Sequence, residues 1–226
     1  MELVYQTLGF VRALASLVVV LAFAYALRGA LARREIQFWV AAYACTFVGA
    51  SLYLVPEVGP GIHLGNYLGR NSFLALSAGL HWVGSDRLRP APRLHGSAAL
   101  LPPVLLALLV AFLKASFPGR ALAFSLAIAP FLLATAWNLA RLPAGVARSH
   151  ARLAALLLIL HAAFYLARGI AMVRDPREAN LLVWTALSFG VALILQAALA
   201  LLFWLVLEAH LARHPVPGGP ERAPVD

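Results

Sequence analysis

The stretch GRNSFLALSAGLHWVGSD, residues 69 to 86, decides the fold, because it is apolar and membrane-length yet carries a strong charge and a histidine. On a helix that turns about 100° per residue, Ser77 and His81 each fall within roughly 20° of Arg70. The stretch therefore predicts a membrane helix with a polar stripe along one face.

The composition of the whole chain is that of a membrane protein. Of its 226 residues, 62% are hydrophobic and 12% are charged, and the mean hydropathy is +0.84, whereas a soluble domain has roughly 25% charged residues. The formal net charge of +9 comes largely from arginines in short connections between apolar runs, so we expect no nucleic-acid partner. The single cysteine, Cys45, excludes a disulfide framework and a cysteine metal site.

Seven apolar runs are long enough to cross a hydrocarbon core of about 30 Å. The predicted fold class is all-α, a polytopic transmembrane helical bundle of seven helices over residues 1–212, and prolines predict that residues 213–226 form a disordered cytoplasmic tail. The predicted spans are Leu8 to Leu27, Gln37 to Val55, Tyr67 to Leu88, Ala98 to Phe117, Ala121 to Leu142, Leu153 to Met172 and Leu181 to Leu207.

Arginine counts predict the orientation of the bundle. The connections RGALARR, DRLRPAPR and RLPAGVARSHAR each contain three arginines, while the alternate connections are poorer in basic residues or diluted by acids. Positive connections stay in the cytoplasm, so we expect the N-terminus outside and the C-terminus inside. Trp39, Trp82, Trp137 and Trp204 fall near the predicted cytoplasmic ends, as an aromatic belt would.

Polar residues near the outer ends of three spans predict a small cavity that is open to the outside. A charged side chain within a span usually faces the bundle interior or a water-filled cavity. Arginines could bind an anionic ligand there through their guanidinium forks. The alternative is that these arginines reach up to lipid phosphates. The predicted ligand-binding residues are Arg12, Arg70, Asn71, Tyr165 and Arg168.

A second, deeper set of buried polar residues comprises Ser77, His81, His161 and Gln196. The two histidines could be axial ligands of a b-type haem, or hold a quinone, in a membrane redox protein. The interpretation we favour is that both are neutral imidazoles hydrogen-bonded to helix carbonyls or to neighbouring side chains, with no metal. We predict no catalytic residues, because no hydrolase, metalloprotease or nucleotide-binding motif and no paired intramembrane carboxylates are present.

Gly61, Gly65 and Gly69 recur every four residues at the start of the third span. Such spacing lets a second helix approach closely, within the chain or in a homodimer. The alternative is that these glycines belong to a flexible loop.

The segments FWVAAYACTFVGASLYL, from Phe38, and GNYLGRNSFLALSAGLHWVGSDRLRPAPR, from Gly65, resemble a known family. They are similar to the second and third helices of the membrane sensor regions found ahead of bacterial diguanylate cyclases and some histidine kinases. The resemblance implies a seven-helix, multi-pass protein of the bacterial inner membrane. No cyclase or kinase sequence follows the last span, so we expect a separate cytoplasmic output protein.

Together these features predict a non-enzymatic protein of sensor type that lies in the lipid bilayer and binds a small anionic ligand. Three alternatives remain open at this point. One is the redox protein that uses His81 and His161, another is a small-solute transporter, and the third is a lipid-modifying membrane enzyme.

Overall fold

The computed structural model describes the chain except for residues 1, 32, 55–61, 113–115, 144–146 and 214–226. The described part is all-α, with seven α-helices and three short 3-10 helices. The α-helices are α1 (Glu2–Ala26), α2 (Arg34–Ser51), α3 (Ile62–Arg87), α4 (Leu101–Phe112), α5 (Phe117–Ala140), α6 (Ala147–Arg174) and α7 (Glu178–Arg213). The 3-10 helices are η1 (Arg28–Ala30), η2 (Leu52–Leu54) and η3 (Gly96–Leu100).

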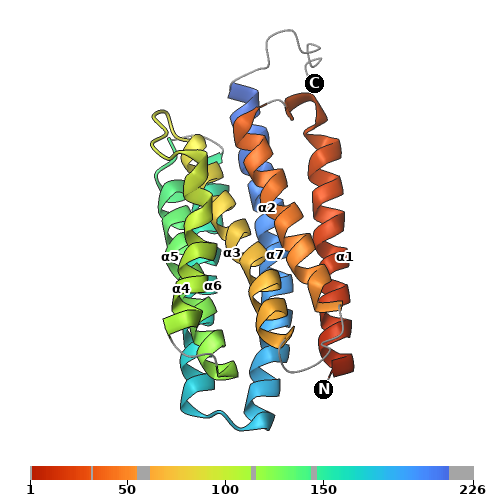
Figure 1. The fold of residues 1–226 in the computed structure, drawn as a ribbon. Coiled ribbons are helices and arrows are strands. Elements are labelled where there is room, and N and C mark those ends of the chain that lie inside the picture. The colour runs from red at the N-terminus through yellow and green to blue at the C-terminus, as the bar shows by residue number, and fades with distance from the viewer. Residues whose placement is uncertain (1, 32, 55–61, 113–115, 144–146, 214–226) are drawn as a thin grey trace.

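The helices run up and down in turn, so that α1 begins at one end of the bundle and α7 finishes at the other (Figure 1). Six of them close into a ring in which α1 packs on α2, α2 on α3, α3 on α5, α5 on α6, α6 on α7 and α7 on α1. The remaining helix, α4, packs on α3 and α5 from outside the ring. The ring is therefore complete without α4.

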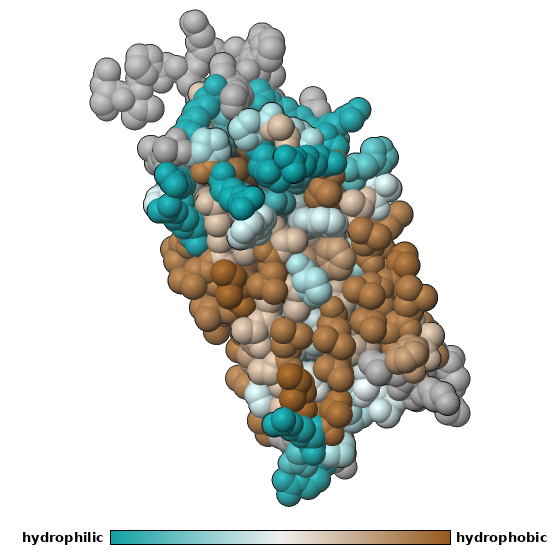
Figure 2. Space-filling model, turned by 90° about the vertical axis from the view of Figure 1, so that its left-hand side faces the viewer, coloured by the Kyte–Doolittle hydropathy of each residue, from teal (hydrophilic) through white to brown (hydrophobic). Residues whose placement is uncertain are grey.

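Within the described ranges, five helices are long and apolar enough to cross a membrane: α1, α2, α5, α6 and α7. Figure 2 shows a hydrophobic belt between two hydrophilic ends on the face formed by α4, α5 and α6. Exposed side chains of these three helices include Val104, Leu108, Leu126, Leu133, Leu156 and Leu160. An apolar surface of this extent matches lipid, because monomeric soluble proteins keep their exposed apolar patches small.

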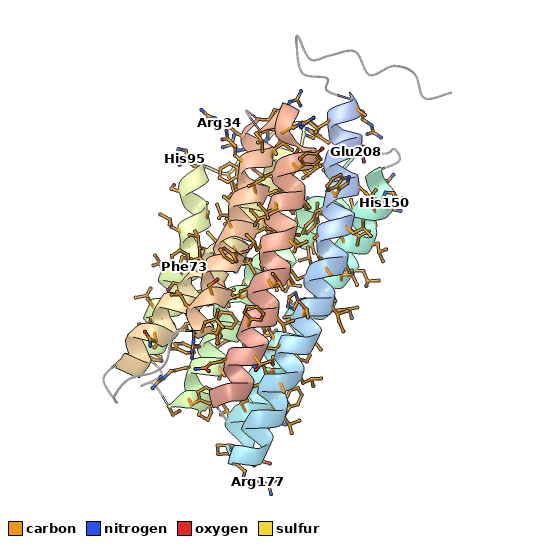
Figure 3. The ribbon with its side chains drawn as sticks, turned by 90° about the vertical axis from the view of Figure 1, so that its right-hand side faces the viewer. Arg34, Phe73, His95, His150, Arg177 and Glu208 are labelled. Carbon is orange, nitrogen blue, oxygen red and sulfur yellow. The ribbon has the colours of Figure 1, made fainter. Side chains whose placement is uncertain are left out.

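The arginine-rich connections lie together at one end of the bundle. Figure 3 shows Arg34, His95, His150 and Glu208 at this end and Arg177 at the opposite end. The three connections that follow α1, α3 and α5 all reach this end (Figure 1). The charge asymmetry expected from the sequence is thus an asymmetry of the folded molecule.

The fourth predicted span is shorter than expected and begins differently. The chain forms η3 first, and α4 then carries Pro102 and Pro103 in its first turn, where a missing N–H costs nothing. Together η3 and α4 rise roughly 28 Å, close to the thickness of a hydrocarbon core. The predicted end at Phe117 is wrong, because Ser116 caps α5 by accepting the backbone N–H of Gly119.

A glycine of α3 lets η3 pack closely from outside the ring. A Cβ atom added at Gly79 would overlap the carbonyl oxygen of Ala99, so η3 rests directly on the backbone of α3. The glycine face predicted at the start of the third span does not contact a described helix. Added Cβ atoms at Gly65 and Gly69 would meet nothing within 4 Å, so these two glycines bring no described helix close, and Gly61 lies outside the described residues.

The aromatic belt holds only in part. Trp137 is exposed at the arginine-rich end, where the Arg141 guanidinium lies 3.7 Å from its ring centroid. Trp39 is only 1% exposed, so its assignment to the belt is wrong. Its ring packs against Phe203 instead, with 4.1 Å between centroids. Apart from Arg213, which ends α7, the predicted disordered tail lies outside the described residues.

A buried carboxylate orders the connection after α3. Asp86, 1% exposed, accepts the backbone N–H groups of Arg93 and Leu94 at 2.7 and 2.8 Å. Arg89 adds an ion pair of 3.2 Å to the same carboxylate. The preceding residue, Ser85, accepts a hydrogen bond from Asn138 of α5 at 3.1 Å. Arg89 donates to the side-chain oxygen of the same Asn138 at 3.5 Å, so the connection is held against both α3 and α5.

Candidate ligand-binding cavity

A cavity lies inside the ring and is lined by all six of its helices, while α4 contributes no side chain. Its volume is about 80 Å³, counted as the space open to the centres of water molecules. On α7 the lining extends from Ala192 to Phe203, about 16 Å along the helix axis. The cavity is thus a narrow slot parallel to the helices. Its polar lining residues are Arg12, Tyr43, Thr46, Ser77, His81, His161, Tyr165 and Gln196.

His81 occupies one end of the slot within a nest of aromatic rings. Its centroid lies 5.1 Å from those of Trp39 and Tyr43 and 5.6 Å from that of Phe203. Nδ1 lies 3.5 Å from the hydroxyl of Ser77, at the limit of a hydrogen bond. Nε2 is buried and has no hydrogen-bond partner within the described part of the chain. The aromatic rings fix the imidazole, and one nitrogen remains available.

His161 lies half-way along α6 and faces the same slot. Its ring stacks on that of Tyr165, one turn later, with 4.7 Å between centroids and 21° between planes. Neither imidazole nitrogen has a partner among the described residues. Arg12 of α1 is close enough for its charge to act on this imidazole. The first and sixth helices thus place a cation beside a histidine.

Gln196 closes the slot between α7 and α1. Its Nε2 atom donates to the hydroxyl of Ser16 at 2.8 Å, and that hydroxyl donates to the carbonyl oxygen of Arg12 at 2.8 Å. Oε1 is buried without a partner in the described structure. The amide therefore joins two helices through its nitrogen and leaves its carbonyl oxygen free.

The expectation that neighbouring groups satisfy both histidines is met only in part, because Ser77 contacts Nδ1 of His81 while no described group bonds to His161. Burial removes water, and the polar side chains nearest to His161 are a stacked phenol and a guanidinium, which give its nitrogens no hydrogen bond. Five lining side chains keep buried polar atoms with no partner in the described chain: Arg12, Tyr43, His81, His161 and Gln196. Buried polar groups in proteins are nearly always hydrogen-bonded, so this concentration of unpaired atoms marks the slot.

The structure divides the predicted site residues into two groups. Arg12 and Tyr165 line the slot together with all four of the predicted buried polar residues. Arg70 lies outside it, with its guanidinium 4.3 Å from the ring centroid of Tyr53. Asn71 is outside as well, and its amide donates to the backbone carbonyl of Tyr67 at 2.8 Å within its own helix.

Arg168 is the third predicted ligand-binding residue outside the slot. Its charge acts on Tyr67, as do those of Arg70 and Arg120, so the three arginines gather around one phenol. The phenol itself donates to the backbone carbonyl of Arg120. These outer arginines form a separate basic cluster.

Sequence reasoning missed two polar lining residues of α2. The hydroxyl of Thr46 lies 2.8 Å from that of Ser77, and Tyr43 contacts the ring of His81. A signal was present, because Trp39, Tyr43 and Thr46 follow one another at spacings of four and three, which places them on one helix face.

A haem does not fit between His81 and His161 in this arrangement. A slot of about 80 Å³ holds roughly five to eight water molecules, whereas a porphyrin needs a broad flat cleft between its axial ligands. The rings of Trp39, Tyr43 and Phe203 already stand around His81. No group of three or more histidine, cysteine, aspartate or glutamate residues within the described ranges could hold a metal ion.

Comparisons of the chain with models of protein families, with curated proteins and with solved structures found no match.

Proposed function

We propose that this chain is a sensor-type protein of the bacterial inner membrane that binds a small molecule in the slot between its six ring helices. In this proposal the seven helices all span the bilayer, with the N-terminus outside and the arginine-rich end in the cytoplasm. A separate cytoplasmic protein docks at that end and responds to ligand binding in the slot.

The unpartnered atoms of the slot carry this proposal. A buried donor or acceptor without a partner costs about 1–3 kcal/mol, and five side chains of one small cavity contain such atoms. Partners for these atoms come from outside the protein, either water or a ligand, and the convergence of five side chains on one slot favours a ligand. A ligand that made several of these hydrogen bonds together would bind with high specificity, because a molecule lacking one of the groups leaves a buried atom unpaired.

The ring architecture supports a sensor because a ligand in the slot touches every helix of the ring. Binding shifts an equilibrium between helix arrangements when the ligand prefers one of them. The slot and the arginine-rich end are joined by rigid helices: α3 continues from His81 to Arg87, and α7 from Phe203 to Arg213. A change in the packing of these helices would therefore reach the surface where the output protein docks.

The arginine-rich connections support the proposed orientation. Connections with clustered arginines are retained in the cytoplasm, and here three of them meet at one end. The apolar belt of Figure 2 supports a bilayer position between the two hydrophilic ends.

A pair of alanine variants on α7 tests the proposal. Ala192→Leu fills the slot, because Ala192 lines it and is 2% exposed. Ala197→Leu is the matched control, since Ala197 is exposed on the outside of the same helix. Protein purified from native membranes in mild detergent is analysed by mass spectrometry for bound small molecules, and each variant is screened by thermal unfolding against a metabolite library.

We expect at least one compound to be bound by, or to raise the melting temperature of, the wild type and Ala197→Leu but not Ala192→Leu. The proposal fails if no compound does so, or if Ala192→Leu responds like the control. Uptake of the same compound into vesicles that contain the wild type would show a transporter instead.

A further inference from the structure

We infer that the ligand of the slot is a small monocarboxylate whose carboxylate binds the guanidinium of Arg12 and whose apolar body lies against α5 and α6. This inference rests on the proposed function, because it names the class of molecule that the same slot would take.

The charge of the lining is the first argument. Among the residues that line the slot, Arg12 is the only arginine or lysine, and none is an aspartate or a glutamate. The two lining histidines and Tyr43 add N–H and O–H groups that can donate to an anion. The slot is therefore electropositive at one place and offers further donors along its length.

The surroundings of Arg12 are the second argument. Its Nε atom is buried with no partner among the described residues, and its guanidinium carbon lies 6.0 Å from the ring centroid of Phe189. None of the ion pairs described in the structure includes Arg12. Arg12 is half-buried, so its charge is only partly hydrated, and an anion that enters the slot meets it as the nearest lining cation.

The geometry of a guanidinium selects the kind of anion. Its planar fork binds a carboxylate through two parallel hydrogen bonds, which a lysine ammonium cannot do. A single cation balances a single negative charge. A phosphate dianion would place its second charge against an apolar wall, where burial of an unpaired charge is costly.

The opposite wall of the slot is apolar. Phe124, Ile128 and Leu132 line it from α5, and Leu158 lines it from α6. Hydrocarbon placed against this wall gains about 25 cal/mol for each Å² removed from water. A volume of about 80 Å³ limits the body of the ligand to a short chain of about two to four carbons, because a cavity that binds a benzene ring has about 150 Å³.

The outer basic cluster offers a matched control residue. Arg168 also has a buried Nε atom without a partner in the described structure, but it does not line the slot. Replacing Arg168 therefore removes one buried guanidinium from the same protein without touching the proposed contact.

The test compares carboxylates with neutral molecules of the same shape. The probes are propionate and butyrate against propionamide and butyramide, and affinity is measured by calorimetry on the wild type, Arg12→Gln, Arg12→Lys and Arg168→Gln in detergent. We expect the wild type and Arg168→Gln to bind the carboxylates at least about tenfold more tightly than the amides. Arg12→Gln should lose this preference, and Arg12→Lys should keep part of it, because charge remains without the fork.

Equal binding of carboxylates and amides by the wild type, or an undiminished preference in Arg12→Gln, would overturn the inference. If Arg12→Gln does not fold, the preference of the wild type and its reduction in Arg12→Lys decide the question. If the wild type binds carboxylates and amides equally and Ala192→Leu binds neither, the inference of a carboxylate ligand is overturned. The proposed ligand site in the slot then still stands. If the wild type binds none of the probes, the inference of a carboxylate ligand is also overturned. The search for co-purified small molecules then decides the proposed function independently.

Discussion

The carboxylate of Asp86 accepts the backbone N–H of Leu94, eight residues later, at 2.8 Å. The same Oδ2 atom accepts the backbone N–H of Arg93 at 2.7 Å. A side chain that ends α3 therefore determines where the chain leaves that helix and how η3 and α4 return along it.

Replacing Asp86 by asparagine should destabilise the protein by about 1.5–3 kcal/mol, because hydrogen bonds to a charged acceptor are lost at a buried position. The measurement is chemical unfolding in detergent. Asp175→Asn is the control, since Asp175 pairs with Arg177 at the surface and exposed pairs contribute little. A similar loss of stability in both variants would contradict the role given to Asp86.

Replacing Ser16 by alanine should cost about 0.5–1.5 kcal/mol, because Gln196 loses the hydroxyl that accepts its amide hydrogen. Ser51→Ala is the matched control, since the described bond of that hydroxyl goes only to a carbonyl of its own helix, that of Phe47. Unfolding of both variants is compared with that of Gln196→Ala and of the double variant with Ser16→Ala. A coupling energy near zero in this cycle would show that the contact contributes nothing to stability.

Two glycines of α3 should respond in opposite ways to alanine. Gly79→Ala should destabilise the fold by about 1–3 kcal/mol, because the new methyl group overlaps the carbonyl oxygen of Ala99. Gly65→Ala meets no atom within 4 Å and should be neutral, or stabilising by up to about 1 kcal/mol through helix propensity. Thermal unfolding compares the two. Equal effects would mean that η3 moves away from α3 at no cost.

The orientation of the bundle can be measured with single cysteines. In a Cys45→Ala background, Ser97→Cys places a thiol at the arginine-rich end and Pro176→Cys places one at the opposite end, both at exposed positions. A membrane-impermeant thiol reagent on intact inner-membrane spheroplasts should label only Pro176→Cys. Labelling of Ser97→Cys alone would reverse the proposed topology.

Helical periodicity correctly predicted which residues of α3 share one face, but not which of them line the slot. Ser77 and His81 line the slot, whereas Arg70 shares their face and lies outside the lining, because the angle between residues on one helix says nothing about where the neighbouring helices leave space. About 10 Å of helix separates Arg70 from Ser77, enough to pass from the slot to the ring of Tyr53.

The helices could be predicted because long apolar runs and arginine-rich connections are local features of a sequence. The boundary between α4 and α5 was missed because the run from Leu105 to Phe117 is apolar almost throughout, while the cap at Ser116 is a single polar residue. Which helices form the ring depends on contacts between distant segments, such as that of Thr46 with Ser77 or of Ser16 with Gln196, and no single helix pattern contains that information.

The closure of the ring by α1 and α7 has a consequence during synthesis. Ser16 and Gln196 are 180 residues apart, so at about 5–20 residues per second roughly 10–40 s pass between their translation. In that interval the slot lacks the wall that Ala192, Gln196, Leu199 and Phe203 of α7 form. The slot is therefore enclosed only once the last helix has been made.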